Sequence, residues 1–208
     1  MGVKDQTVGG FLDSVAAATP TPGGGSVSAL AGALGAALAR MVAGLAREKK
    51  GYESVQSDLV QIEAKASAVQ ERLLSLVEKD ARSYEAVLGA MRLPKATDAE
   101  RTSRVEAMQA AYREATHVPI ETMEACAEVL ELAASALDKG NRGATTDAAV
   151  AILLAEAGLR GAGLNAKINL ASIKDEAFRS ATEAKLDRLL AHADEVGHRA
   201  MALAEGRI

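Results

Sequence analysis

The stretch TPTPGGGSVSALAGALGAALARMVAGL, residues 19–45, decides the fold class of this chain. Two prolines and three consecutive glycines precede a long run of Ala, Leu, Val and Gly, which indicates a tight connection followed by an apolar helix. We expect Ser26 to be the N-cap of that helix, which then runs to about Lys49. Glycines and alanines recur along it at three- and four-residue spacing, Gly32 and Gly35 among them. Rows of such small side chains let another helix approach closely, and they predict either the centre of a bundle or a dimer seam.

The remainder of the chain consists of amphipathic segments separated by Pro and Gly, and no segment has the alternating pattern of a strand. The expected features are a short helix capped by Thr7, a long helix over 54–91, a capping box of Thr97 and Glu100, a helix boundary at Pro119, a cap at Thr145 or Thr146, and a final charged helix. The sequence therefore predicts one all-α domain over residues 1–208, a multihelical antiparallel bundle with long helices.

Composition narrows the class of protein. Of 208 residues only 2% are aromatic and none is Trp, so the core is built from Ala, Leu and Val, as in closely packed helices. The net charge of −4 argues against nucleic-acid binding, which requires a basic face. The one cysteine, Cys126, excludes an internal disulfide. The first ten residues lack the apolar region of a signal peptide, and the apolar stretch 26–46 contains Arg40 and is weakly hydrophobic. We expect a cytoplasmic protein without a membrane span.

Asp80 is the candidate catalytic residue. It lies in LVEKDARSYEAV, residues 76–87, where Leu76, Val77 and Tyr84 are three or four positions away and place it at the border of the buried helix face. A carboxylate there is partly desolvated and its pKa is raised, which suits a general acid or base near neutral pH. The alternative is a structural acid with a charged partner.

Other polar and glycine-rich features have a structural and a functional interpretation. The glycine loop is either a tight turn or a place where free N–H groups at a helix start bind an anion or a carbonyl oxygen. The basic group Arg47, Lys49 and Lys50 either stabilises a helix C-terminus or binds substrate carboxylates. A further set of small polar side chains either caps helices or binds the donors and acceptors of a heterocycle such as a pterin: Asn141, Thr146, Asp147, Asn165 and Asn169.

A metal site is a further alternative. Glu114-x-x-His117 and Glu195-x-x-His198 both match the helical Glu-x-x-His motif of di-iron carboxylate bundles. That site needs two more glutamates from two other helices, and Pro119 breaks the pattern beside the first motif. Cys126 lies in an apolar helical run, where a buried, unreactive thiol is expected.

Several stretches, in this order, resemble one known family: PTPGGGSVSALAGALGAALARMVAGL, REKKGY, EKDARSYEAVLGAMRLPKATDAE, ATHVPIETMEAC and KGNRGATTDAAVAILLAEAGLRGAGLNAKINLASIKD. This is the cyclodeaminase/cyclohydrolase family of folate one-carbon metabolism. It comprises the C-terminal domain of formiminotransferase-cyclodeaminase and stand-alone bacterial methenyltetrahydrofolate cyclohydrolases. The resemblance implies an all-α bundle that dimerises, a reduced folate as substrate, and either of the two reactions.

The resemblance also implies roles for particular residues and no metal or organic cofactor. Asp80 matches the family's catalytic acid. The candidate substrate-binding residues are Gly23, Gly24, Gly25 and Ser26 through backbone donors, Lys50 and Lys95 for the glutamate carboxylates or the one-carbon unit, and Asn141, Asp147, Asn165 and Asn169 for the pterin edge. The chain departs from the family pattern at REKKGY, where Tyr52 is displaced by one residue, and at Thr146, where Ser is usual. Two other classes compete with this interpretation, namely a di-iron helical oxidoreductase and a non-catalytic helical dimer.

Overall fold

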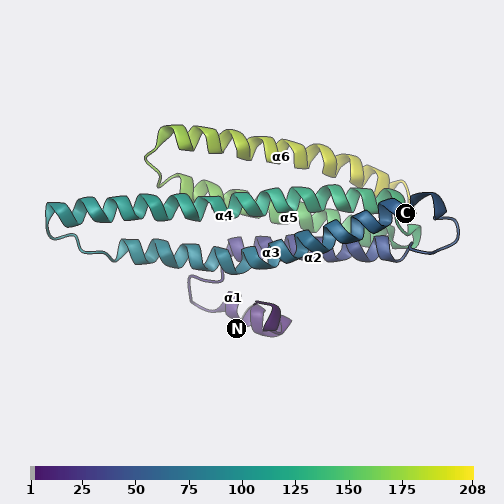
Figure 1. Cartoon of the computed structure of the whole chain (residues 1–208), viewed down its shortest axis with the longest axis horizontal. Coiled ribbons are helices and arrows are strands. Elements are labelled where there is room, and N and C mark those ends of the chain that lie inside the picture. Colours follow the sequence, from purple (N-terminus) through teal and green to yellow (C-terminus); the bar gives the residue numbers. More distant parts are fainter. Residues whose placement is uncertain (1–2) are drawn as a thin grey trace.

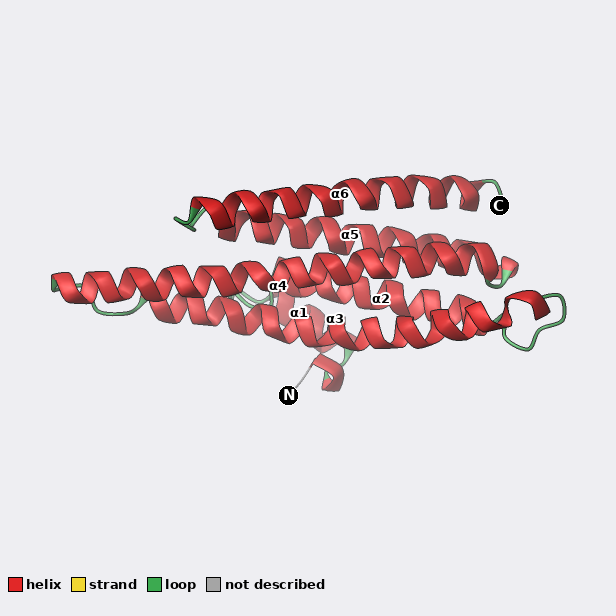
Figure 2. Ribbon diagram, turned by 45° about the horizontal axis from the view of Figure 1, so that its top comes forward, coloured by secondary structure: helices red, strands yellow, loops and turns green. Residues whose placement is uncertain are grey.

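The computed structural model of the chain describes residues 3–208 and contains helices only in that range, as Figure 2 shows. The α-helices are α1 (Val8–Ala16), α2 (Gly24–Gly44), α3 (Gln56–Met91), α4 (Asp98–Lys139), α5 (Thr145–Leu170) and α6 (Glu176–Glu205), with short 3-10 turns at Val3–Asp5, Glu53–Val55 and Arg142–Ala144. The all-α prediction is confirmed.

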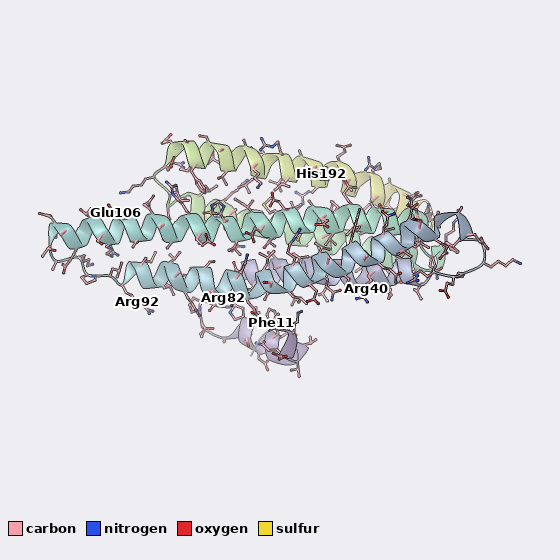
Figure 3. The ribbon with its side chains drawn as sticks, in the orientation of Figure 1. Phe11, Arg40, Arg82, Arg92, Glu106 and His192 are labelled. Carbon is pink, nitrogen blue, oxygen red and sulfur yellow. The ribbon has the colours of Figure 1, made fainter. Side chains whose placement is uncertain are left out.

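Helices α2, α3, α4 and α5 form an antiparallel bundle, and α6 packs along α4 and α5 (Figure 1). Ion pairs support α6, among them Lys185 with Glu124 of α4 (2.6 Å). Helix α1 lies outside the bundle and turns its one buried residue, Phe11, towards it (Figure 3). Helices α3 and α4 extend further than α2, so the N-terminus of α2 lies part-way along α3. As a result, the first turn of α2 lies against side chains of α3 and α5.

The small residues of α2 lie at the centre of the bundle. An added Cβ at Gly35 would be 2.9 Å from the carbonyl oxygen of Ala151, and one at Gly32 would be 2.6 Å from Cys126 Sγ. The rows of small side chains therefore face α4 and α5 of the same chain and are not a dimer seam. Helix α2 is long and apolar enough to cross a membrane by length and composition, with a mean hydropathy of 1.5, but half of that window is buried inside the bundle. Its apolar character follows from its central position.

The start of α2 differs from the prediction. The helix begins at Gly24 with Gly23 as its N-cap, and no side chain caps it. Ser26 lies inside the first turn and is completely buried, and its hydroxyl group points to α3. The expected N-cap at Ser26 is wrong because the serine is bound by a partner from another helix. The helix also ends earlier than expected, at Gly44.

Pro119 does not end a helix. It lies inside the 42-residue helix α4. Proline lacks the N–H group that would bond to the carbonyl of the residue four positions earlier, Ala115. That carbonyl instead accepts a hydrogen bond from Asn169 Nδ2 of α5, at 2.6 Å. The expected boundary is wrong because a side chain from another helix satisfies the carbonyl that the proline leaves free.

Two of the four expected caps are present. Thr7 accepts a hydrogen bond from the Gly10 N–H, and Thr97 with Glu100 forms a complete capping box. The cap expected at Thr145 or Thr146 is wrong, because α5 begins at Thr145 and its hydroxyl donates to the carbonyl of Arg142.

Candidate functional site

The first turn of α2 lies directly against Asp80 of α3. The Ser26 hydroxyl donates to Asp80 Oδ2 at 2.8 Å and also lies 3.1 Å from the Val77 carbonyl oxygen. A Cβ added at Gly25 would be only 2.6 Å from Asp80 Cγ. A glycine at position 25 is therefore what allows the carboxyl group to lie against the α2 backbone.

The surroundings of Asp80 raise its pKa. Burial is the main cause, because it disfavours the charged form, and hydrogen bonds from the Ser26 hydroxyl and the Ser26 backbone N–H offset part of the effect. No charged side chain is among the causes. The shift expected from the sequence is thus present, and desolvation produces it. A carboxyl group in this state exchanges a proton closer to neutral pH than an exposed aspartate does.

Two further polar groups flank the same helix end. The N–H groups of Gly24 and Gly25 have no hydrogen-bond partner among residues 3–208, and they lie at the positive end of the α2 dipole. On the α5 side, a Cβ added at Gly24 would be 3.4 Å from Asn165 Nδ2. Asn165 donates that amide to the Gly161 carbonyl at 2.9 Å, which leaves its carbonyl oxygen as an acceptor. The N-terminus of α2 therefore has a carboxyl group of α3 on one side and an amide of α5 on the other, a set of groups that suits chemistry at a carbon bearing oxygen and nitrogen.

The structure brings only some of the predicted site residues together. Those around the α2 N-terminus are Gly23, Gly24, Gly25, Ser26, Asp80 and Asn165. Asn169 lies one turn beyond Asn165, but its amide nitrogen is bound to the Ala115 carbonyl. Lys95 is exposed in the connection between α3 and α4, and the end of α3 is about 16 Å from Asp80 along the helix.

Lys50, Asn141 and Asp147 form a second group at the opposite end of α2, about 30 Å from the Asp80 group along that helix. Asn141 accepts from the Gly143 N–H at 2.9 Å, as expected of a cap, and lies 3.4 Å from Lys49 Nζ. Beside it is a cleft of about 560 Å³ whose lining includes Tyr52, Lys139 and Arg142. The Tyr52 hydroxyl accepts from the Arg142 N–H (3.1 Å), and the Lys49 ammonium lies 5.8 Å from the Tyr52 ring.

The two Glu-x-x-His motifs do not converge on one metal position. His117 packs edge-on against Phe178 at the start of α6, whereas His198 lies near the other end of α6 with its ring nitrogen 2.7 Å from the Asp194 carbonyl. No group of three or more His, Cys, Asp or Glu side chains suited to a metal occurs within residues 3–208. Cys126 is buried, as expected, and burial raises its pKa to about 12.

Sequence reasoning missed the contact between Ser26 and Asp80, the interaction that defines this site. The two residues are 54 positions apart, and no local pattern links them. It also placed Tyr84 on the buried face of α3, whereas its side chain is 41% exposed one turn beyond Asp80.

A sequence profile described as formiminotransferase-cyclodeaminase matches residues 7–188 of the chain. The chain belongs to this family. Within the family it is 40% identical over 195 residues to a methenyltetrahydrofolate cyclohydrolase of Methylorubrum extorquens, covering 94% of both chains. It is 35% identical over 189 residues to the formimidoyltransferase-cyclodeaminase of Rattus norvegicus, of which the match covers 35%. The crystal structure of a formiminotetrahydrofolate cyclodeaminase from Thermotoga maritima superposes with a TM-score of 0.89, 30% identity and 98% coverage of both chains. The family resemblance seen in the sequence is confirmed, and the di-iron alternative is not favoured.

Proposed function

We propose that this chain is a folate enzyme that hydrolyses methenyltetrahydrofolate to formyltetrahydrofolate. The observation that carries the proposal is the Asp80 carboxyl group, whose pKa is raised by burial and which lies beside the N-terminus of α2, where the N–H groups of Gly24 and Gly25 have no partner among residues 3–208. The 40% identity to a methenyltetrahydrofolate cyclohydrolase over 94% of both chains supports the choice of reaction.

In the proposed reaction, water attacks the carbon that bridges two ring nitrogens of the substrate. Ionised Asp80 accepts a proton from the water as the new C–O bond forms, and the resulting tetrahedral carbon carries one oxygen and two nitrogens. The Gly24 and Gly25 N–H groups stabilise charge that develops on the oxygen. Asp80 then gives its proton to one nitrogen, and that C–N bond breaks as the hydroxyl oxygen releases its remaining proton to solvent, which leaves the formyl group on the other nitrogen. Each step is a proton transfer or an addition at carbon, so we propose that no cofactor takes part.

The absorbance of the methenyl chromophore tests this proposal. We expect purified protein to speed its decay, a chelator to leave the rate unchanged, and Asp80→Asn to remove most of the acceleration while the helical circular dichroism is retained. Decay at the uncatalysed rate with the wild-type chain would overturn the proposal. A rate that falls with chelator would show that the reaction depends on a metal ion.

The second candidate is the cyclodeaminase reaction, which the cyclodeaminase name of the Thermotoga maritima structure favours. There the neighbouring nitrogen attacks the formimino carbon, Asp80 protonates the departing ammonia, and the methenyl bridge forms. Appearance of the methenyl chromophore from formiminotetrahydrofolate measures this reaction with the same variant as control.

We also propose that the enzyme is a cytoplasmic homodimer that pairs through α2 and α5. Large apolar side chains are exposed along the outer side of these two adjacent helices: Val27, Leu34, Met41 and Leu45 on or directly after α2, and Val150, Leu153, Leu164 and Ile168 on α5. Monomeric proteins rarely expose a continuous apolar surface of this extent, and a second copy of the same surface is its simplest cover. We call it the α2–α5 face.

Pairing would also explain the two separated groups of predicted residues. The Asp80 group and the Lys50 group lie at opposite ends of the α2–α5 face. In a two-fold dimer with antiparallel α2 helices, the Lys50 group of one protomer would approach the Asp80 group of its partner. Lys50, Asn141 and Asp147 would then bind the substrate of the neighbouring chain.

Sedimentation measures the assembly directly. We expect a dimer for the wild-type chain and a monomer for Leu34→Glu, with Val60→Glu as the matched control because Val60 is similarly exposed but lies on α3. A wild-type monomer, or binding to lipid vesicles in place of self-association, would contradict the proposal.

A further inference from the structure

The Ser26 side chain has an unusual environment for a residue of the site. It is completely buried, so it does not reach solvent or a bound substrate. Its oxygen nevertheless lies within hydrogen-bond distance of two acceptors, Asp80 Oδ2 at 2.8 Å and the Val77 carbonyl at 3.1 Å. A hydroxyl group has a single proton, so it donates to one of these acceptors at a time.

The protonation state of Asp80 determines which acceptor is used. When Asp80 is ionised, the hydroxyl donates to Oδ2, because a hydrogen bond to a charged oxygen is the stronger one. When Oδ2 carries the acid proton, that O–H donates to Ser26 Oγ, and the serine proton turns to the Val77 carbonyl. Both states are satisfied by rotation about one C–O bond, with no movement of a heavy atom.

We propose that Ser26 is a positioning residue that holds the Asp80 carboxyl group in one orientation through both protonation states, by switching its hydroxyl proton between Asp80 Oδ2 and the Val77 carbonyl. The role rests on the proposed function of Asp80. Because the two states differ only in which way the Ser26 hydroxyl proton points, the carboxyl group stays in place while it takes up and releases a proton during each turnover.

The charged side chains near Asp80 do not stabilise its ionised form in place of the Ser26 hydrogen bond, because they are paired with other residues. The α2 N-terminus contributes no charge beyond its N–H groups, and Asn165 of α5 is neutral. Lys79 of α3 pairs with Glu121 of α4 at 3.0 Å, and Arg82 lies 3.8 Å from Glu78. The serine is therefore the one side chain that stabilises the ionised form of Asp80 by a hydrogen bond within the described part of the chain.

The test compares Ser26→Ala with Thr122→Val, which removes a buried hydroxyl bonded only within its own helix, to the Val118 carbonyl. The first readout is a carbon-13 NMR titration of the Asp80 carboxyl group, which needs no substrate. In Ser26→Ala we expect its midpoint to move up by about one pH unit, because a hydrogen bond to a charged group is lost. Thr122→Val leaves the midpoint unchanged.

The second readout is the pH dependence of the folate reaction. We expect Ser26→Ala to lower kcat roughly 10- to 100-fold, to leave KM within about threefold, and to shift the acidic limb of the profile upward with the NMR midpoint. An unmoved midpoint, or a change in KM alone, would overturn the proposal for Ser26. A moved midpoint in a chain without folate activity would instead count against the proposed function and leave the switching contact in place.

Discussion

At the scale of single residues, Asp80 is the proposed proton-transfer group, and its ionisation also lowers the stability of the fold. Its pKa in the folded chain is raised above the ordinary value of 3.8 by burial. The protonated form therefore favours folding, and this contribution is complete below pH 3.8 and is lost as the pH rises through the raised folded pKa. Ionising Asp80 in the folded chain therefore costs stability, and no cationic side chain within residues 3–208 is among the causes that offset this cost.

Asp80→Asn is accordingly expected to be inactive and more stable than the wild-type chain at pH 7. A gain of roughly 1 kcal/mol raises the melting temperature of a chain of this size by about 2–4 °C. The difference disappears well below pH 3.8, where Asp80 is neutral in both the folded and the unfolded wild-type chain. Thermal unfolding at both pH values measures it, and equal or lower stability at pH 7 would contradict the account of burial given above.

Gly25 makes the contact between α2 and Asp80 sterically tolerable. Gly25→Ala places a methyl group where the carboxyl group now lies, so we expect the carboxyl to be displaced and kcat/KM to fall about 100-fold. Gly89→Ala is the matched control, because it is also a helical glycine but an added Cβ there has nothing within 4 Å. That variant keeps its activity and gains roughly 0.5–1 kcal/mol of stability.

At the scale of helices, Asn169 and Pro119 form a coupled pair that joins α5 to α4. Asn169→Ala leaves the Ala115 carbonyl without a donor and is expected to destabilise the chain by about 1–3 kcal/mol. Pro119→Ala restores the backbone N–H that this carbonyl lacks. In the double variant most of the loss is therefore recovered, which urea unfolding of the four chains measures. Strictly additive effects would mean that the amide and the missing N–H act independently.

The same pair shows why the sequence predicted some elements and missed others. Caps at Thr7 and Thr97 were readable because donor and acceptor are three residues apart. The continuation of α4 through Pro119 depends on a residue 50 positions later, and the role of Ser26 depends on one 54 positions later. Local periodicity therefore predicted the helices and the position of Asp80 at the border of a buried face, whereas the partners that complete both features come from other helices and leave no local pattern.

At the scale of the whole molecule, the site predicted from the family is divided between the two ends of α2. If an antiparallel dimer reunites it, two inactive variants should complement each other. Asp80→Asn and Lys50→Glu, co-expressed with different tags, form mixed dimers in which one site carries both substitutions and the other carries neither. We expect purified mixed dimers to regain about half of the wild-type rate, on the two-fold symmetry argument. Activity no higher than that of the two parents would place each complete site within one chain.

The packing around Cys126 has a practical consequence. Its thiol lies between α2 and α5, against Gly32 and Gly158, and its pKa of about 12 leaves almost no thiolate at neutral pH. A thiol reagent therefore modifies the chain only when these helices separate. The rate of labelling at increasing urea concentration measures how often the central core opens, and it needs no introduced cysteine. Cys126, a buried thiol outside the candidate site, thus reports how often the helices that assemble the site separate.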